Sequence, residues 1–256
     1  MRIKLLPSNV HASGQLQTLT TFVINDCLTI DAGSISVGLT PDEMSLIRHV
    51  VITHSHNDHI ACLPVFVAEA FTGLDSPITI YGIEEVIQAL KNFIFNDLIW
   101  PDFELIELMN GQGATIRYET LEPRQPLVIA GLRVTPIPVN HVIPTCGMMV
   151  EDDHATIIFS GDTYTTDELW QKAAEQKNLK AIFVDVSFPN ELENLAAASK
   201  HFTPQSLAED LKKLHREVEV YAVHIKPSNR QQVIAQLRAL NNPLIAVAEI
   251  GRVYEW

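Results

Sequence analysis

Three imidazoles and a carboxylate stand within six consecutive positions, in the run His54-Ser55-His56-Asn57-Asp58-His59. Imidazole nitrogens suit zinc and similar divalent ions, and an added carboxylate oxygen permits a second, harder ligand position. Structural roles for histidine seldom crowd three rings so tightly, whereas a metal site requires such crowding. The run therefore predicts a metal site.

The elements on either side of this run must position its side chains. Residues 49–53 read as a buried strand, and an apolar helical stretch begins with the residues after His59. The sequence thus predicts that the ligands lie on a strand-to-helix loop, where a rigid scaffold commonly presents functional groups.

Three further polar residues follow apolar strands at the carboxyl end of each. His141 follows residues 134–140, Asp162 follows residues 156–161, and His224 follows residues 220–223. Polar residues at such ends converge on a site in layered α/β folds. Taken singly, each histidine has the alternative of a hydrogen-bonded core residue, and Asp162 that of a turn residue. Together with the run they favour ligation.

This set of residues resembles the metallo-β-lactamase fold superfamily, in order and over most of the chain. The resemblance implies an α/β (α+β) fold, a four-layer αβ/βα sandwich, formed by residues 1–256 as a single domain. It also implies two divalent metal ions, zinc by default with manganese or iron as alternatives. One ion would be held by His54, His56 and His141, the other by Asp58, His59 and His224, and both by the bridging Asp162.

Two ions about 3.5–4 Å apart can bridge a hydroxide and clamp both the attacking and the leaving oxygen. That chemistry suits hydrolysis of phosphodiesters, thioesters, lactones or β-lactams. The fold alone leaves the substrate open.

Three later segments narrow the range of expected substrates. Residues 185–190 (DVSFPN), 199–204 (SKHFTP) and 224–227 (HIKP) resemble the class II cyclic-nucleotide phosphodiesterases, and the first two resemble ribonuclease Z more loosely. The resemblance implies hydrolysis of 3′,5′-cyclic nucleotides, cyclic AMP first, to nucleoside 5′-monophosphates.

The roles implied for individual residues follow from that reaction. Asp185 would support His201, whose proton would reach the departing ribose 3′ oxygen, an effect worth roughly 10²–10⁴-fold in rate. Asp58 would be both ligand and catalytic residue. Lys226 would contact the phosphate as a point charge, with Ser187 and Asn190 as further substrate contacts. The open alternatives are a helix-start histidine bonded to backbone for His201 and a surface lysine for Lys226.

Composition limits the partners. The formal net charge of −13 disfavours long nucleic acid, whose phosphates supply most of its affinity for proteins, so a small anionic substrate is expected. The absence of an apolar run of about 18 residues excludes a membrane span. The N-terminus lacks the apolar stretch of a secretory signal, and the three dispersed cysteines fit a reducing cytoplasm. A homodimer is expected from the resemblance alone.

Three alternatives stay open beside the phosphodiesterase. A ribonuclease Z-like nuclease would need a Gly-rich basic arm for tRNA, and this sequence contains none. A thioesterase or lactonase of the same fold would need neither His201 nor Lys226. A non-catalytic metal-binding protein is disfavoured because the predicted ligand set is complete.

Hydrophobic periodicity and turn residues predict the elements around the site. Strands are expected at residues 4–6, 20–24, 27–31, 49–53, 78–81, 114–118, 127–129, 132–136, 147–150, 156–160, 181–184, 218–222 and 244–248. Helices are expected at residues 41–46, 63–71, 83–95, 167–176, 191–198, 204–214 and 230–239, and irregular structure at 100–113.

Overall fold

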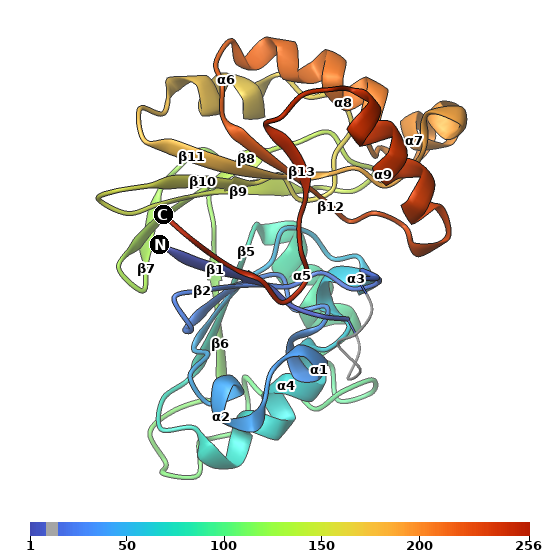
Figure 1. Cartoon of the computed structure of the whole chain (residues 1–256). Coiled ribbons are helices and arrows are strands. Elements are labelled where there is room, and N and C mark those ends of the chain that lie inside the picture. Colours follow the sequence, from blue (N-terminus) through green and yellow to red (C-terminus); the bar gives the residue numbers. More distant parts are fainter. Residues whose placement is uncertain (9–14) are drawn as a thin grey trace.

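Short apolar runs bounded by turns form two seven-stranded sheets in the part of the chain that the structure describes, residues 1–8 and 15–256. The structure is a computed structural model (Figure 1). The first sheet has the order β14-β1-β2-β3-β4-β5-β6, with β1 (Arg2–Leu5), β2 (Phe22–Ile24), β3 (Leu28–Ile30), β4 (His49–Val51), β5 (Ile78–Gly82), β6 (Ile116–Thr120) and β14 (Val253–Glu255). The second has the order β13-β12-β11-β10-β9-β8-β7, with β7 (Leu127–Ile129), β8 (Leu132–Pro138), β9 (Cys146–Glu151), β10 (Thr156–Phe159), β11 (Leu179–Asp185), β12 (Glu219–Val223) and β13 (Ile245–Val247).

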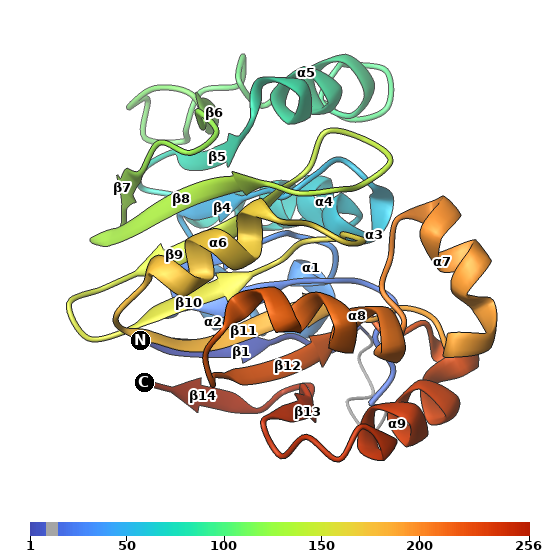
Figure 2. The ribbon, with the colours of Figure 1, turned by 90° about the horizontal axis from the view of Figure 1, so that it is seen from above.

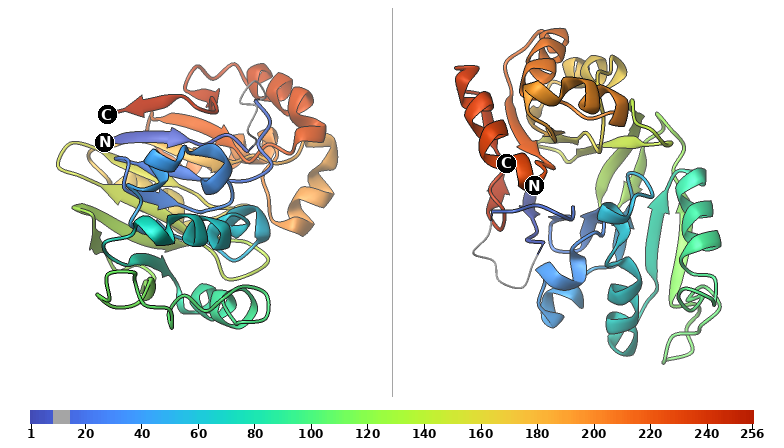
Figure 3. Two further views of the ribbon diagram at one scale, coloured as in Figure 1. Left: turned by 90° about the horizontal axis from the view of Figure 1, so that it is seen from below. Right: turned by 90° about the vertical axis from the view of Figure 1, so that its right-hand side faces the viewer.

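Helices cover the outer face of each sheet, as the ribbon views show (Figures 1 and 3). The first sheet is flanked by α1 (Ile35–Gly38), α2 (Pro41–Met44), α4 (Leu63–Ala70) and α5 (Glu84–Phe93). The second is flanked by α6 (Glu168–Glu175), α8 (Pro204–Asp210) and α9 (Arg230–Ala239). The remaining helical elements are α3 (Asn57–Ile60), α7 (Glu193–Ser199) and the 3₁₀ turns η1 (Phe71–Gly73), η2 (Asn190–Leu192), η3 (Leu211–Leu214) and η4 (Pro227–Asn229).

The inner faces of the two sheets share one apolar core. Phe22 of the first sheet lies 4.8 Å from the Phe159 ring and 5.1 Å from the Phe183 ring of the second, measured between ring centroids. Full burial of such a side chain contributes about 1.5–3 kcal/mol. The layered αβ/βα sandwich predicted from the sequence is therefore confirmed, whereas assignment of all 256 residues to one domain stays a prediction.

Parallel pairing brings the chemistry-bearing loops to one edge. Strands β3 to β6 are parallel to one another, and so are β10 to β13. Their carboxyl ends point the same way within each sheet, and the loops that follow them gather near α3, α7 and α8, toward the right of Figure 2. Polar residues that end these strands are thereby brought to a common site.

The structure differs from the sequence prediction at several short elements. Residues 57–60 form the single helical turn α3, where a loop was expected. The elements α1 and β14 were not predicted. Strand β14 forms by pairing antiparallel to β1, which joins the two ends of the chain, a contact that local pattern does not show. Residues 100–113 contain isolated bridges but no helix or strand, as expected.

Candidate metal centre

The histidine-rich segment follows β4 and packs against the turn that follows β3. The Thr20 backbone N–H donates to the Asp58 carbonyl at 2.8 Å, and the Ala32 N–H donates to that of His59 at 2.7 Å. A Cβ added to Gly33 would lie 2.0 Å from the Asp58 carbonyl oxygen. Only glycine permits this approach, so the backbone of the neighbouring turn fixes the segment in place.

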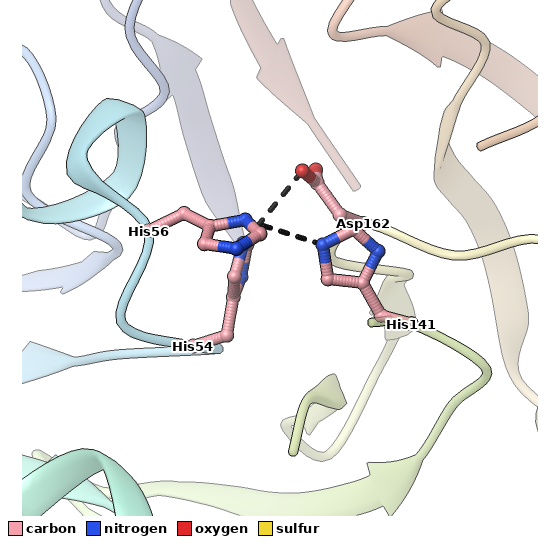
Figure 4. Close-up of side chains that lie close together, drawn as sticks. All are labelled: His54, His56, His141 and Asp162. Atoms are coloured by element: carbon pink, nitrogen blue, oxygen red, sulfur yellow. Dashed lines mark hydrogen bonds and ion pairs between the residues drawn. The ribbon is translucent and has the colours of Figure 1, made fainter. Parts of the chain in front are cut away.

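A first group of ligand atoms comes from both sheets. One donor atom each from His54, His56, His141 and Asp162 lies within 4.8 Å of the other three (Figure 4). His56 Nδ1 faces His141 Nε2 at 3.2 Å, and His54 Nε2 lies 3.6 Å from Asp162 Oδ2. Tetrahedral coordination with bonds of about 2.0–2.1 Å would separate ligand nitrogens by ~3.3 Å, so these donors suit one zinc-sized ion.

A second group shares Asp162 with the first. It contains Asp58, His59, Asp162 and His224, whose donor atoms meet the same 4.8 Å limit. His224 Nε2 lies 3.0 Å from Asp58 Oδ2, and His59 Nε2 lies 3.3 Å from Asp162 Oδ1. The two groups contain the same residues as the two predicted ligand sets, and Asp162 is common to both. Binding of metal by these residues stays a prediction.

In three of the rings the nitrogen Nδ1 is held by a second partner. Asp31 Oδ2 lies 2.7 Å from His59 Nδ1, the Lys200 carbonyl lies 3.2 Å from His141 Nδ1, and Ser187 Oγ lies 2.8 Å from His224 Nδ1. Such partners orient ligand histidines and leave Nε2 directed at the metal.

Asp31 was not predicted as a functional residue. It was read as part of a turn, although it ends an apolar strand in the same way as the predicted ligands do. Its other carboxylate oxygen accepts hydrogen bonds from the Thr53 N–H at 2.8 Å and the Thr53 hydroxyl at 2.9 Å. Asp31 therefore fixes both ends of the segment that carries the histidines.

The two groups differ in the direction in which the pKa values of their histidines are shifted. Burial lowers the pKa of the three rings in the first group, most strongly that of His54, which favours their neutral form. In the second group burial opposes charge, but Asp162 and its neighbours outweigh it and raise the pKa of His59 and of His224, the latter to about 9. Burial also opposes the charge of Asp58 and Asp162, yet histidines beside them, His224 foremost, hold both pKa values well below the usual range.

Two buried nitrogens indicate that the groups fit metal ions. His54 Nε2 and His59 Nε2 have no hydrogen-bond partner among the residues that the structure describes. A buried polar atom left unpaired costs roughly 1–3 kcal/mol, which coordination would recover. Together with a donor set of five imidazoles and two carboxylates, these nitrogens are what a pair of divalent ions requires.

A third group lies beside the second. His201 Nδ1 is 2.6 Å from Asp185 Oδ2, and Ser187 Oγ donates to Asp185 Oδ1 at 2.7 Å. The same His201 nitrogen lies 4.0 Å from Asp162 Oδ2. The histidine and carboxylate that the sequence paired therefore meet at the border of the ligand groups.

The three predicted substrate contacts have different surroundings. Lys226 is partly exposed, with Nζ 3.5 Å from Asp58 Oδ2. Ser187 is fully buried and bonded internally, which makes it a support for Asp185 and His224 in this structure. The side-chain oxygen of Asn190 accepts from the Gln205 N–H at 2.9 Å. Contact of each with substrate stays a prediction.

The other histidines were predicted to be structural or surface residues. His49 Nδ1 bonds to the Tyr81 hydroxyl at 3.0 Å, away from the ligand groups. His154 is exposed in the turn between β9 and β10, and His215 follows η3. His11 lies outside the described residues. Among the residues that are described, no helix combines the length and apolar character needed to cross a bilayer.

Comparison with known sequences gives one family match and several relatives. The profile of the "Beta-lactamase superfamily domain" matches residues 30–225. A "Probable 3',5'-cyclic-nucleotide phosphodiesterase" of Yersinia pestis is 30% identical over 211 residues, which cover 72% of this chain and 59% of the relative. A "Ribonuclease Z" of Mycobacterium bovis is 30% identical over 132 residues, which cover 49% of this chain and 47% of the relative.

Comparison with solved structures bears on the fold alone. The crystal structure of unliganded yeast PDE1 superimposes with a TM-score of 0.79 at 20% identity, covering 98% of each chain. This chain spans about three fifths of the length of the Yersinia pestis relative.

Proposed function

The chain belongs to the β-lactamase superfamily, as its ligand residues predicted, and from that premise we propose that it is a metal-dependent phosphodiesterase. The expected likeness to cyclic-nucleotide phosphodiesterases is confirmed by the first relative described above. Its substrates would be 3′,5′-cyclic nucleotides, cyclic AMP first, and its products nucleoside 5′-monophosphates.

The observation that carries this proposal is the Asp185–His201 pair. Its 2.6 Å contact lies beside the two ligand groups, and neither Asp185 nor His201 belongs to either of them. Opening a cyclic phosphate expels a ribose 3′ alkoxide, a poor leaving group that needs a proton. A thioester or lactone needs no such donor placed for a ribose oxygen, so the pair favours the phosphodiester.

Asp185 would hold His201 in the form that the reaction needs. Its carboxylate occupies Nδ1, which leaves Nε2 as the nitrogen available to substrate. A carboxylate in this position stabilises the imidazolium and fixes the ring orientation, as in other histidine–carboxylate pairs. His201 would then give the Nε2 proton to the departing oxygen.

The remaining charges would orient the phosphate. Lys226 stands at the border of the second ligand group and would bind a nonbridging oxygen as a point charge. His54, His56 and His141 would hold one ion, and Asp58, His59 and His224 the other, with Asp162 bridging. When bound, the ions would make water nucleophilic and offset the charge of the phosphate. We propose zinc for both positions because imidazoles predominate.

A ribonuclease Z-like activity is the second candidate. The relative of that name, 30% identical over 132 residues, favours it. The formal net charge of −13 opposes it, because binding of long nucleic acid depends on neutralising phosphates. We keep the small cyclic substrate as the proposal, with a cytoplasmic location and a homodimer as predictions that accompany it.

The proposal is tested with the zinc-loaded protein on cyclic AMP, cyclic GMP, bis-p-nitrophenyl phosphate, a thioester, a lactone and a precursor tRNA. We expect cyclic nucleotides to be turned over fastest. His201→Ala should lower the kcat for cyclic AMP roughly 10²–10⁴-fold with the metal content unchanged. Rapid turnover of the thioester alone, or of the tRNA alone, would overturn the choice of substrate.

A further inference from the structure

One carboxylate outside the ligand groups ties together the segments that carry them. Glu193 is the first residue of α7, in the connection between β11 and α8. Its Oε1 accepts a hydrogen bond from the Tyr164 hydroxyl at 2.5 Å, and its Oε2 accepts one from the Thr203 hydroxyl at 2.6 Å. Hydrogen bonds to a carboxylate are shorter and about twice as strong as neutral ones. We call Glu193 and its two donors the Glu193 bridge.

The Tyr164 side of the bridge leads to the bridging ligand. Tyr164 stands two residues after Asp162, and its backbone N–H donates to the Asn140 carbonyl at 3.0 Å. Asn140 directly precedes His141, and its side-chain amide donates to the Thr165 carbonyl at 2.9 Å. One arm of the bridge is therefore attached to the loops that present Asp162 and His141.

The Thr203 side of the bridge leads to His201. Thr203 is fully buried two residues after His201 and is the N-cap of α8, accepting from the Ser206 N–H at 3.2 Å. The intervening backbone is constrained because the His201 N–H donates to the Ala196 carbonyl at 2.9 Å. Lys200 adopts the left-handed region with φ 61°. A displacement of Thr203 would therefore also displace His201.

We propose that Glu193 is a positioning residue for proton delivery by His201. Asp185 fixes the orientation of the His201 ring, whereas the bridge fixes where that ring stands relative to Asp162. A carboxylate suits this task because it only accepts hydrogen bonds, so both hydroxyls must donate to it. Glu193 touches neither ligand group, and the inference rests on the proposed function for the step that it serves. In Figure 2, α7 stands beside α8 at the edge where the loops gather.

The test compares two substrates that differ in their need for a proton. Cyclic AMP expels an alkoxide, whereas bis-p-nitrophenyl phosphate expels a stable phenolate that leaves without one. We expect Glu193→Ala in the zinc-loaded protein to lower the kcat for cyclic AMP about 10–100-fold, since misplacement by 1 Å can cost that much. The KM, the metal content and the kcat for bis-p-nitrophenyl phosphate should stay within about threefold of wild type.

Conservative variants separate positioning from folding. Glu193→Gln keeps one acceptor and should restore most of the cyclic AMP activity, whereas Tyr164→Phe removes one arm and should show an intermediate loss. Glu191→Ala is the matched control, because Glu191 lies in the same connection but binds Gln232 and Gln236, each at 2.8 Å. It should leave both activities within about twofold of wild type.

The outcomes distinguish failure of the positioning role of Glu193 from failure of the proposed phosphodiesterase function. If wild type hydrolyses cyclic AMP but Glu193→Ala loses the same factor on both substrates, or on neither, the positioning role is refuted and the proposed function stands. If wild type hydrolyses bis-p-nitrophenyl phosphate and no cyclic nucleotide, the proposed function fails and the positioning role with it. A selective loss on cyclic AMP, restored by glutamine, supports both.

Discussion

The two sheets contribute to the metal centre in different ways. The first sheet supplies His54, His56, Asp58 and His59 from one loop and its helical turn. The second supplies His141, Asp162 and His224 from three separate strand ends, together with the Asp185–His201 pair. One contribution is local in sequence and the other is assembled by strand pairing.

The difference lies in what holds each set in place. The first set is fixed by a neighbouring turn, through backbone bonds from Thr20 and Ala32 and the close approach of Gly33. In the second set, Asp162 and His224 depend on the parallel register of β10, β11 and β12, in which Phe159 pairs with Phe183 and Asp185 with Val223. A slip of one residue in these strands would turn the polar ends to the opposite face.

The largest expected effect comes from the residue that both groups share. Asp162→Ala should lose both ions together and lower phosphodiesterase activity by more than the 10- to ~100-fold typical of outer partners. Metal analysis alongside the cyclic AMP assay checks this, with Asp153→Ala in an exposed turn as the control. Two retained ions would show that Asp162 bridges nothing.

The next test separates the carboxylates that support each sheet's histidines. Asp31→Asn should weaken metal binding by roughly 10–100-fold through His59, and excess zinc should restore activity. Asp185→Asn should instead lower kcat by a similar factor through His201, and zinc should not restore it.

Zinc titrations and steady-state kinetics on both variants measure this contrast. The same response to zinc in the two variants would remove the distinction between a support for metal binding and a support for proton transfer.

The smallest expected effects concern two glycines, one for each sheet. A Cβ on Gly33 would lie 2.0 Å from the Asp58 carbonyl oxygen, and one on Gly147 would lie 2.8 Å from that of Ser160. Both alanine variants should lose about 1–3 kcal/mol of unfolding free energy, and Gly33→Ala should lose more than Gly147→Ala. Each Cβ would meet a backbone oxygen, which cannot move without distorting the chain around it. Each kcal/mol lowers the Tm by about 2–4 °C in a chain of this size.

Calorimetry on the zinc-loaded protein measures both losses. Gly73→Ala, whose Cβ would meet nothing within 4 Å, is the control and should change stability by less than about 0.5 kcal/mol. Equal Tm values for Gly33→Ala and the control would mean that the turn does not press on the histidine segment.

The hydrophobic pattern of the sequence predicted the elements that bury apolar residues. The helix expected at 230–239 is α9 (Arg230–Ala239), and the strand expected at 127–129 is β7 (Leu127–Ile129). The helix expected at 204–214 continues as the 3₁₀ turn η3 after Asp210. Strand β14 was missed because it forms by pairing with β1, a partner at the other end of the chain. The local sequence does not indicate such a partner.

By itself the sequence determined the superfamily and predicted the candidate ligands and the loops that carry them, because six crowded residues and polar strand ends are local features. Only the tertiary structure decided that Asp31 supports His59 and that Glu193 joins Tyr164 to Thr203. The Asp31–His59 and Glu193–Tyr164 contacts join residues 28 and 29 positions apart, and the Glu193–Thr203 contact joins residues 10 positions apart. Strand register and sheet packing bring these residues within hydrogen-bond distance, and spacing along the sequence does not encode that distance.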